Sequence, residues 1–99
     1  MPDKRTSRLV VSVEHLVLGR AVRELRARRD LSQERLGFHS GLHRNYVGAI
    51  ERGEINATFR TLLTLSSGLI IPLSELIRLY ERRRPDHIPS ETTRGERHA

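Results

Sequence analysis

The chain has 99 residues, of which 36% are hydrophobic and 4% aromatic, and it has no tryptophan and no cysteine. This length suits one small domain with an aliphatic core, and the lack of cysteine excludes disulfides, thiolate zinc sites and cysteine nucleophiles. Eighteen basic and twelve acidic residues give a formal net charge of +6 at pH 7. This balance favours a polyanionic partner, with nucleic acid before a membrane surface. Basicity that only keeps the protein soluble is the alternative.

The two ends of the chain differ in composition from the part between them. Residues 1–13 combine a proline, hydroxyl residues and basic residues with a short apolar stretch, and we expect a flexible arm there. Residues 85–99 are rich in charge and proline, which is typical of a disordered tail. No apolar run approaches the roughly 20 residues of a membrane span, and Glu14 and His15 interrupt the only segment that resembles a signal peptide. We therefore expect a cytoplasmic protein with one domain over residues 14–84.

Helical periodicity and capping residues predict two helices at the start of this domain. The first extends from about residue 14 to residue 29. The apolar residues at the i, i+4, i+7 spacing of its inner face are Leu18, Val22 and Leu25. A second helix of about two turns begins after the N-cap Ser32 and ends at Gly41. Because a short polar segment leads directly into a third helix at residues 43–52, this part of the chain has the pattern of a helix-turn-helix.

Two further helices are predicted after the polar loop that follows Gly53. Thr58 is a suitable N-cap for the fourth helix. The residues expected along one face of this helix are Phe59, Leu62, Leu63 and Ser66. The fifth helix begins near Pro72, since proline is favoured at the start of a helix. The domain is therefore expected to contain five helices.

Three segments resemble, in order and spacing, the phage-repressor or Xre-type helix-turn-helix family: LSQERL, GLHRNYVGAIERGE, and TLLTLSSGL followed by PLSELI. The resemblance covers residues 16–80. It implies an all-α, compact five-helix fold like that of lambda repressor, in which the helix at residues 43–52 enters the major groove of DNA. The implied function is a sequence-specific regulator of transcription that binds double-stranded DNA, without enzyme activity or a cofactor.

The resemblance also implies roles for the residues of that third helix. Arg44 and Asn45 are the main candidates for base reading, because arginine can donate two hydrogen bonds to guanine and asparagine can pair with adenine. Gly48 and Ala49 would lie against the bases one turn later, where small residues allow close approach. The alternative for Arg44 and Asn45 is a solvated polar face. Without the flanking motifs, that alternative would be preferred.

Four residues are candidates for contacts to DNA phosphates: Gln33, His43, Tyr46 and Arg52. Gln33 lies at the start of the second helix, where free N–H groups favour an anion; the alternative is an ordinary first-turn residue. For Tyr46 the alternative is partial packing. The resemblance further implies a structural ion pair between Arg26 of the first helix and Glu51 of the third helix.

Four residues depart from the pattern of the family. His43 stands where the N-cap is usually serine or threonine, and Gly37 replaces an alanine at a helix cost of roughly 1 kcal/mol. Phe38 occupies a position that is usually polar, either under the arm or in contact with a partner. Ile70 replaces the glycine that commonly ends the fourth helix, and since a β-branched residue resists the left-handed conformation, we expect this turn to be built differently.

We expect a homodimer on a partly palindromic operator, with the interface in the fourth and fifth helices. The residues nominated for that interface are Leu73, Ile77, Leu79 and Tyr80; the alternative is that all of them pack inside the monomer. No metal site is predicted, because the histidines are scattered, and no small-molecule ligand is evident. Two other functions stay open: a protein-interaction or antitoxin-type module of the same fold, and a non-specific nucleic-acid-binding protein.

Overall fold

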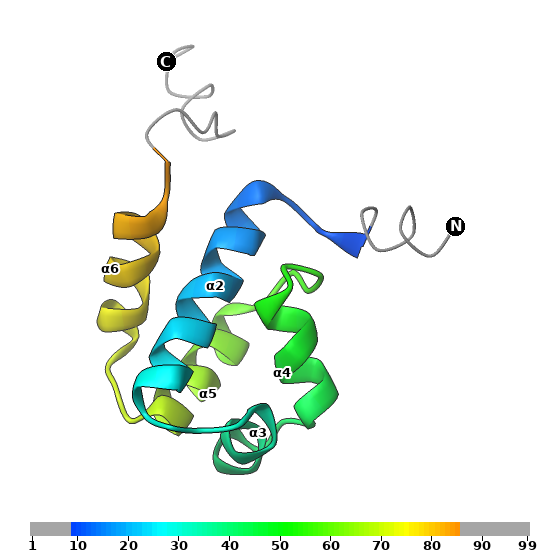
Figure 1. Cartoon of the computed structure of the whole chain (residues 1–99), viewed down its shortest axis with the longest axis vertical. Coiled ribbons are helices and arrows are strands. Elements are labelled where there is room, and N and C mark those ends of the chain that lie inside the picture. The colour runs from blue at the N-terminus through cyan, green and yellow to red at the C-terminus, as the bar shows by residue number, and fades with distance from the viewer. Residues whose placement is uncertain (1–8, 86–99) are drawn as a thin grey trace.

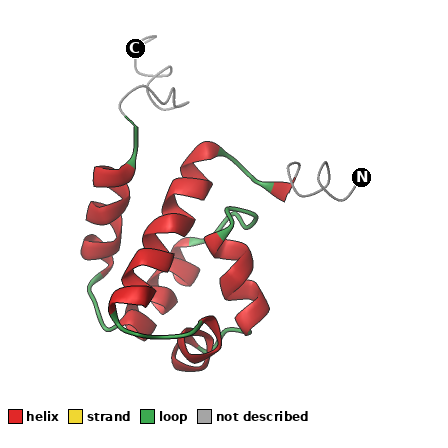
Figure 2. Ribbon diagram, in the orientation of Figure 1, coloured by secondary structure: helices red, strands yellow, loops and turns green. Residues whose placement is uncertain are grey.

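The computed structural model describes residues 9–85, and its regular elements in that range are helices (Figures 1 and 2). They are α2 (Val13–Arg28), α3 (Gln33–Ser40), α4 (Arg44–Glu51), α5 (Phe59–Leu69) and α6 (Leu73–Arg83). The predicted all-α fold with five helices in this part of the chain is confirmed. The predictions for the arm at 1–8 and for the tail at 86–99 lie outside the described residues.

The N-termini of α2 to α5 are each capped by the side chain of the preceding residue. In each case the side chain accepts a hydrogen bond from a backbone N–H in the first turn, which satisfies one of the free donors there. The caps are Ser12 to His15 (3.1 Å), Ser32 to Arg35 (2.9 Å), His43 to Asn45 (3.0 Å) and Thr58 to Thr61 (3.1 Å). His43 caps with its ring Nδ1, so an imidazole replaces the usual hydroxyl.

The turn after α5 differs from our expectation. Ile70 adopts the left-handed conformation, with φ 59° and ψ 48°, so the turn has the usual geometry although its residue is β-branched. The N–H groups of Ile70 and Ile71 donate to the carbonyls of Ser67 and Ser66, both at 3.0 Å. Arg29 Nη2 donates to the Ile70 carbonyl at 2.9 Å. These bonds complete the C-terminal motif that normally uses glycine, and they hold isoleucine in an unfavourable conformation.

The core lies where the five helices meet, and each of them contributes aliphatic side chains. Its buried members are Ala21, Val22, Leu25, Leu36, Val47, Ile50, Leu65, Leu69, Leu76 and Leu79. On α5 the prediction of the apolar face was wrong in part. Leu65 and Leu69 occupy the core-facing positions, which turns Phe59 and Leu63 outward to 67% and 44% exposure.

Helices α6 and α4 lie on opposite sides of α2 (Figure 1). Arg83 of α6 donates to Glu24 of α2 at 2.8 Å, and Arg28 donates to the same carboxylate at 2.6 Å. The Arg83 hydrogen bond is the main cause of a lowered pKa at Glu24. Among the described residues, no single helix is long and apolar enough to cross a membrane; α5 and α6 pass by length and composition only as a pair bent by 102°.

Candidate nucleic-acid interface

Helices α3 and α4 form the helix-turn-helix, and α4 presents its polar face to solvent. Gly41, with φ 72°, ends α3, and Leu42 N–H then donates to the Gly37 carbonyl at 2.8 Å. An alanine at residue 37 would place its Cβ against the Leu42 carbonyl. The glycine that departs from the family pattern therefore permits this tight turn. This turn places α4 close to α3.

The residues predicted to read bases do not all lie in the same environment. Arg44 and Asn45 are exposed in the first turn of α4, and Ala49 is half-exposed one turn later, while Val47 and Ile50 are buried in the core. Arg44 Nη1 lies 3.7 Å from Glu34 Oε1 of α3, and both side chains are largely exposed. No sequence pattern predicted this contact between the two helices.

Gly48 differs from the other predicted reading residues because it is buried. A side chain at this position would begin 3.1 Å from Arg52 Nη1 and 3.3 Å from Gln33 Oε1. The backbone of Gly48 is therefore covered by two neighbouring side chains, and its direct approach to bases stays a prediction.

Arg26 and Glu51 lie in direct contact, and Gln33 joins them. Glu51 Oε2 accepts from Arg26 Nε at 2.7 Å, and Glu51 Oε1 accepts from Arg26 Nη2 at 3.1 Å and from Gln33 Nε2 at 2.9 Å. Arg26 Nη1 also donates to the Leu31 carbonyl at 2.7 Å. This network connects α2, the loop before α3, the first residue of α3 and the last residue of α4. Sequence reasoning missed the part played by Gln33.

The remaining phosphate candidates lie at the two ends of α4. His43 is exposed at the N-terminus of α4 and caps it, whereas Tyr46 is half-buried and packs against the core. Arg52 is exposed after the C-terminus, where its Nε and Nη2 donate to the two carboxylate oxygens of Glu54 at 3.1 and 3.3 Å. Glu54 was also missed, because a glutamate in a polar loop carries no distinguishing pattern.

The residues nominated for a dimer interface are mostly used inside the monomer. Leu79 is 1% exposed in the core, so this nomination was wrong: the helical period turns Leu79 toward the other core leucines. Leu73, Ile77 and Tyr80 are half-buried. Ile77 and Tyr80 line a shallow apolar hollow with residues of α2. Among residues 9–85, no group of three or more metal-ligating side chains is placed to hold an ion.

Comparison with known proteins places this geometry in a family. Residues 22–76 match the model of a helix-turn-helix family. The chain is 43% identical over 61 residues to the control protein C.SmaI of Serratia marcescens, covering 62% of this chain and 73% of that protein. It is 35% identical over 63 residues to the control protein C.BamHI of Bacillus amyloliquefaciens, covering 63% and 78%.

Solved structures agree with this relationship. The crystal structure of the restriction-modification controller protein C.AhdI from Aeromonas hydrophila is 43% identical, with a TM-score of 0.64 over 66% of this chain and 98% of that one. Wild-type controller protein C.Esp1396I, at 24% identity and a TM-score of 0.69 over 73% of this chain and 94% of that one, supports the fold alone. The relatives are regulators and not enzymes, as we expected. The family match spans more than half of the chain, and the chain belongs to the Xre-type helix-turn-helix family of DNA-binding transcriptional regulators.

Proposed function

We propose that this protein is a controller of restriction-modification genes that acts in the cytoplasm as a homodimer on a partly palindromic operator. The observation that carries the proposal is the 43% identity to a control protein over 61 residues. The overall basic charge supplies attraction to the duplex. Sequence discrimination is assigned to the exposed face of α4.

Within α4, Arg44 and Asn45 are the proposed base readers, and Ala49 is a proposed contact to a thymine methyl. The exposure of Arg44 and Asn45 in the first turn supports these roles, since the first turn of a recognition helix is the part that enters the groove. Gln33, His43, Tyr46 and Arg52 are the proposed phosphate contacts around it. Each base-reading side chain is expected to contribute roughly 1–3 kcal/mol of discrimination.

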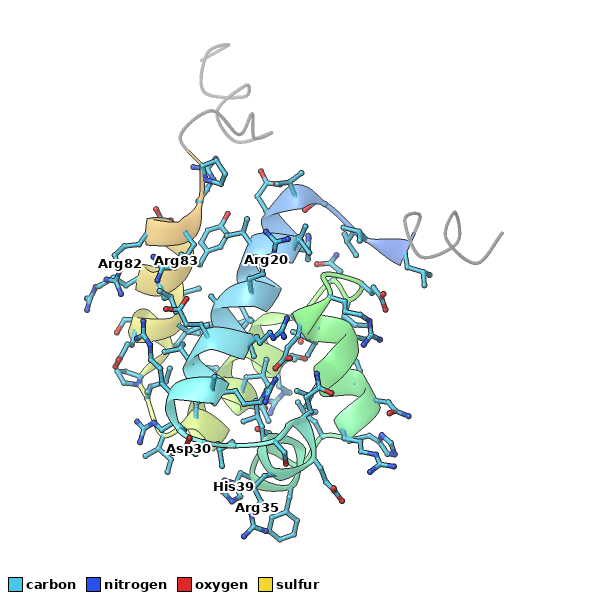
Figure 3. The ribbon with its side chains drawn as sticks, viewed as in Figure 1. Arg20, Asp30, Arg35, His39, Arg82 and Arg83 are labelled. Atoms are coloured by element: carbon cyan, nitrogen blue, oxygen red, sulfur yellow. The ribbon has the colours of Figure 1, made fainter. Side chains whose placement is uncertain are left out.

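Selection of binding sites from random duplex DNA tests this reading. The wild-type protein should select a partly palindromic site, and Arg44→Ala and Asn45→Ala should each lose the preference at one position in each half-site. Arg82→Ala is the matched control, because Arg82 projects from α6, on the far side of α2 from α4 (Figure 3). Unchanged selected sites in both α4 variants would refute the assignment, and selection of no preferred sequence would refute a sequence-specific regulator.

For the homodimer, α5 is the fourth helix of the domain and one of the two that we nominated, and it exposes apolar residues that we did not name. Phe59 and Leu63 lie one turn apart on α5 and are both exposed. Exposed apolar residues at helical spacing are typical of a contact with another helix.

Sedimentation equilibrium tests this interface. Phe59→Ser and Leu63→Ser should weaken self-association, since each removes apolar surface that the dimer would bury. Val13→Ser is the matched control, because Val13 is an exposed apolar residue on a different helix, α2. If neither α5 substitution weakens self-association, this surface is excluded as the dimer interface.

A further inference from the structure

The segment before α2 is fastened to the loop that follows α4. The Val11 N–H donates to the Gly53 carbonyl at 2.8 Å. The His15 ring connects the same two regions, because its Nδ1 lies 2.7 Å from Ser12 Oγ and its Nε2 lies 3.0 Å from Asn56 Oδ1. A neutral imidazole has one donor and one acceptor nitrogen. A ring that donates to Asn56 Oδ1 therefore accepts from the Ser12 hydroxyl, and the two bonds are compatible.

The backbone of this loop also packs directly on the first turn of α2. Gly53 has φ 76°, and a Cβ at this residue would lie 2.8 Å from the Cα of Leu16. Glycine permits both the left-handed conformation and the close approach. The chain therefore enters α2 from the C-terminal end of α4, on the side of α2 on which α4 lies (Figure 1).

Residues 1–8, which precede this fastened segment, lie outside the described part of the chain, and their sequence is MPDKRTSR. They also lie outside the family match, which begins at residue 22. Three of them are cations, Lys4, Arg5 and Arg8, against the single acidic Asp3. A stretch with this charge and almost no apolar side chain has little to bury in a core. Its net charge points instead to an anionic partner.

The place at which these residues join the domain selects one part of a DNA duplex. The first turn of α4 carries the proposed base readers in the major groove, so the opposite end of α4, with its loop, lies over the sugar–phosphate backbone. The minor groove begins on the other side of that backbone. Eight extended residues reach at most about 26 Å, and the minor groove is only about 6 Å wide. Residues 1–8 are therefore long enough to enter it.

We propose that residues 1–8 bind the minor groove next to the segment that α4 reads, and that His15 and Asn56 are positioning residues that fix where this arm leaves the domain. The inference rests on the proposed function and adds a second DNA contact to it. Lysine and arginine favour a narrow, A·T-rich minor groove, because its negative potential is enhanced. The protein should therefore prefer A·T pairs beside each half-site, at positions that α4 does not reach.

Inosine separates recognition in the minor groove from recognition in the major groove. In the selected duplex, the pairs on either side of each half-site are set to A·T, to G·C or to inosine·C. An inosine·C pair keeps the major-groove groups of G·C but lacks the amino group that guanine places in the minor groove. Replacing A·T by G·C should weaken wild-type binding roughly fivefold, at the lower end of the range for a disfavoured pair. Inosine·C should restore the A·T affinity.

The arm variant Lys4→Gln/Arg5→Gln/Arg8→Gln should bind the three duplexes with equal affinity. Its loss of three cations should reduce the slope of log affinity against log salt by about 2–3, while the half-site that it selects should stay the same. Arg94→Gln/Arg97→Gln is the matched control, because it removes cations from the other end of the chain. This control should retain the wild-type preference for A·T flanks.

The role of His15 and Asn56 is tested separately from the charges of the arm. His15→Ala and Asn56→Ala each remove the bond between the His15 ring and Asn56, and in His15→Ala the Ser12 hydroxyl can still accept from the N–H of residue 15. Each variant should lower the ratio of A·T to G·C affinity and keep the wild-type salt slope, since the arm cations are still present. The double variant should have the same ratio as either single variant. A loss of stability alone would leave this ratio unchanged.

Different outcomes separate this inference from the function on which it rests. If the wild type binds no duplex, or selects no sequence, the proposed function fails. If the wild type binds the selected duplex but responds to no flank, or treats inosine·C as G·C, the minor-groove contact is refuted. An arm variant that keeps the wild-type flank ratio refutes it too, because the preference then belongs to the rest of the domain. Unchanged ratios in both His15→Ala and Asn56→Ala overturn the positioning role.

Discussion

Replacing Glu51 by alanine tests whether the network around this carboxylate holds α4 in place. Glu51 accepts three hydrogen bonds, two from Arg26 and one from Gln33. Its side chain is 4% exposed, and that of Arg26 is 15% exposed. Alanine would remove the acceptor of both Arg26 Nε and Arg26 Nη2. Arg26 would keep only its bond to the Leu31 carbonyl.

The size of the effect follows from this burial. Removing one partner of a buried ion pair costs about 3–5 kcal/mol, because the remaining charge is left without a partner. Arg26 keeps one hydrogen bond and some contact with water, so we expect the lower end, about 3 kcal/mol. A domain of this size loses about 4–8 °C of melting temperature per kcal/mol. The melting temperature should therefore fall by roughly 12–24 °C.

Thermal and urea unfolding, followed by circular dichroism, measure this loss. Glu75→Ala on α6 is the matched control, since Glu75 is exposed, and its stability should stay within about 0.5 kcal/mol of the wild type. The double variant Arg26→Met/Glu51→Leu should recover most of the loss, because no unpaired charge remains. A loss below about 1 kcal/mol in Glu51→Ala would refute the reasoning, and so would a double variant as unstable as the single one.

Three other substitutions have expected outcomes. Ser40→Ala should stabilise the fold by about 1 kcal/mol in urea unfolding, because the buried Ser40 hydroxyl has no hydrogen-bond partner; exposed Ser67→Ala is the control, and equal effects would contradict this. Glu24→Gln should destabilise the fold at pH 7, because Arg83 lowers the pKa of Glu24 from 4.5. The difference in unfolding free energy between the wild type and Glu24→Gln should disappear as the pH falls below 4.5 through the lowered pKa of Glu24. A difference that persists in acid would exclude the Glu24 charge as its cause. Ile70→Gly should raise the unfolding free energy of the monomer by about 1 kcal/mol. A lower unfolding free energy would show that the left-handed turn is not strained.

The helices and their caps could be predicted because they depend on neighbours in the sequence. Ser32 and Thr58 are caps by residue type and position, and the inner face of α2 follows from spacing alone. The family resemblance added the pairing of Arg26 with Glu51, which periodicity does not contain. Together, the local patterns and the resemblance predicted the fold, and they proposed α4 as the candidate DNA interface.

What could not be predicted depends on how the helices turn relative to one another. Leu79 and Phe59 each lie in an apolar pattern, but only the packing of α5 and α6 decides that Leu79 is buried and Phe59 exposed. The bond between Gln33 and Glu51 joins residues 18 positions apart, and an amide near a carboxylate has no sequence pattern. The placement of the Gln33 and Arg52 side chains next to Gly48 could not be predicted for the same reason.

Ile70 is the residue at which local preference and structure disagree most clearly. It adopts a left-handed conformation that costs an L-amino acid roughly 1–2 kcal/mol, yet 71% of it is exposed, so burial in the monomer does not offset the strain. Local rules are most often broken where a residue serves a function. Ile70 lies at the C-terminal end of α5, the helix that also exposes Phe59 and Leu63. A contact between two copies along α5 would bury its side chain, so Ile70→Gly should stabilise the monomer and weaken self-association together. If Ile70→Gly stabilises the monomer but self-associates as strongly as the wild type, a dimer contact is not the reason for isoleucine at this position.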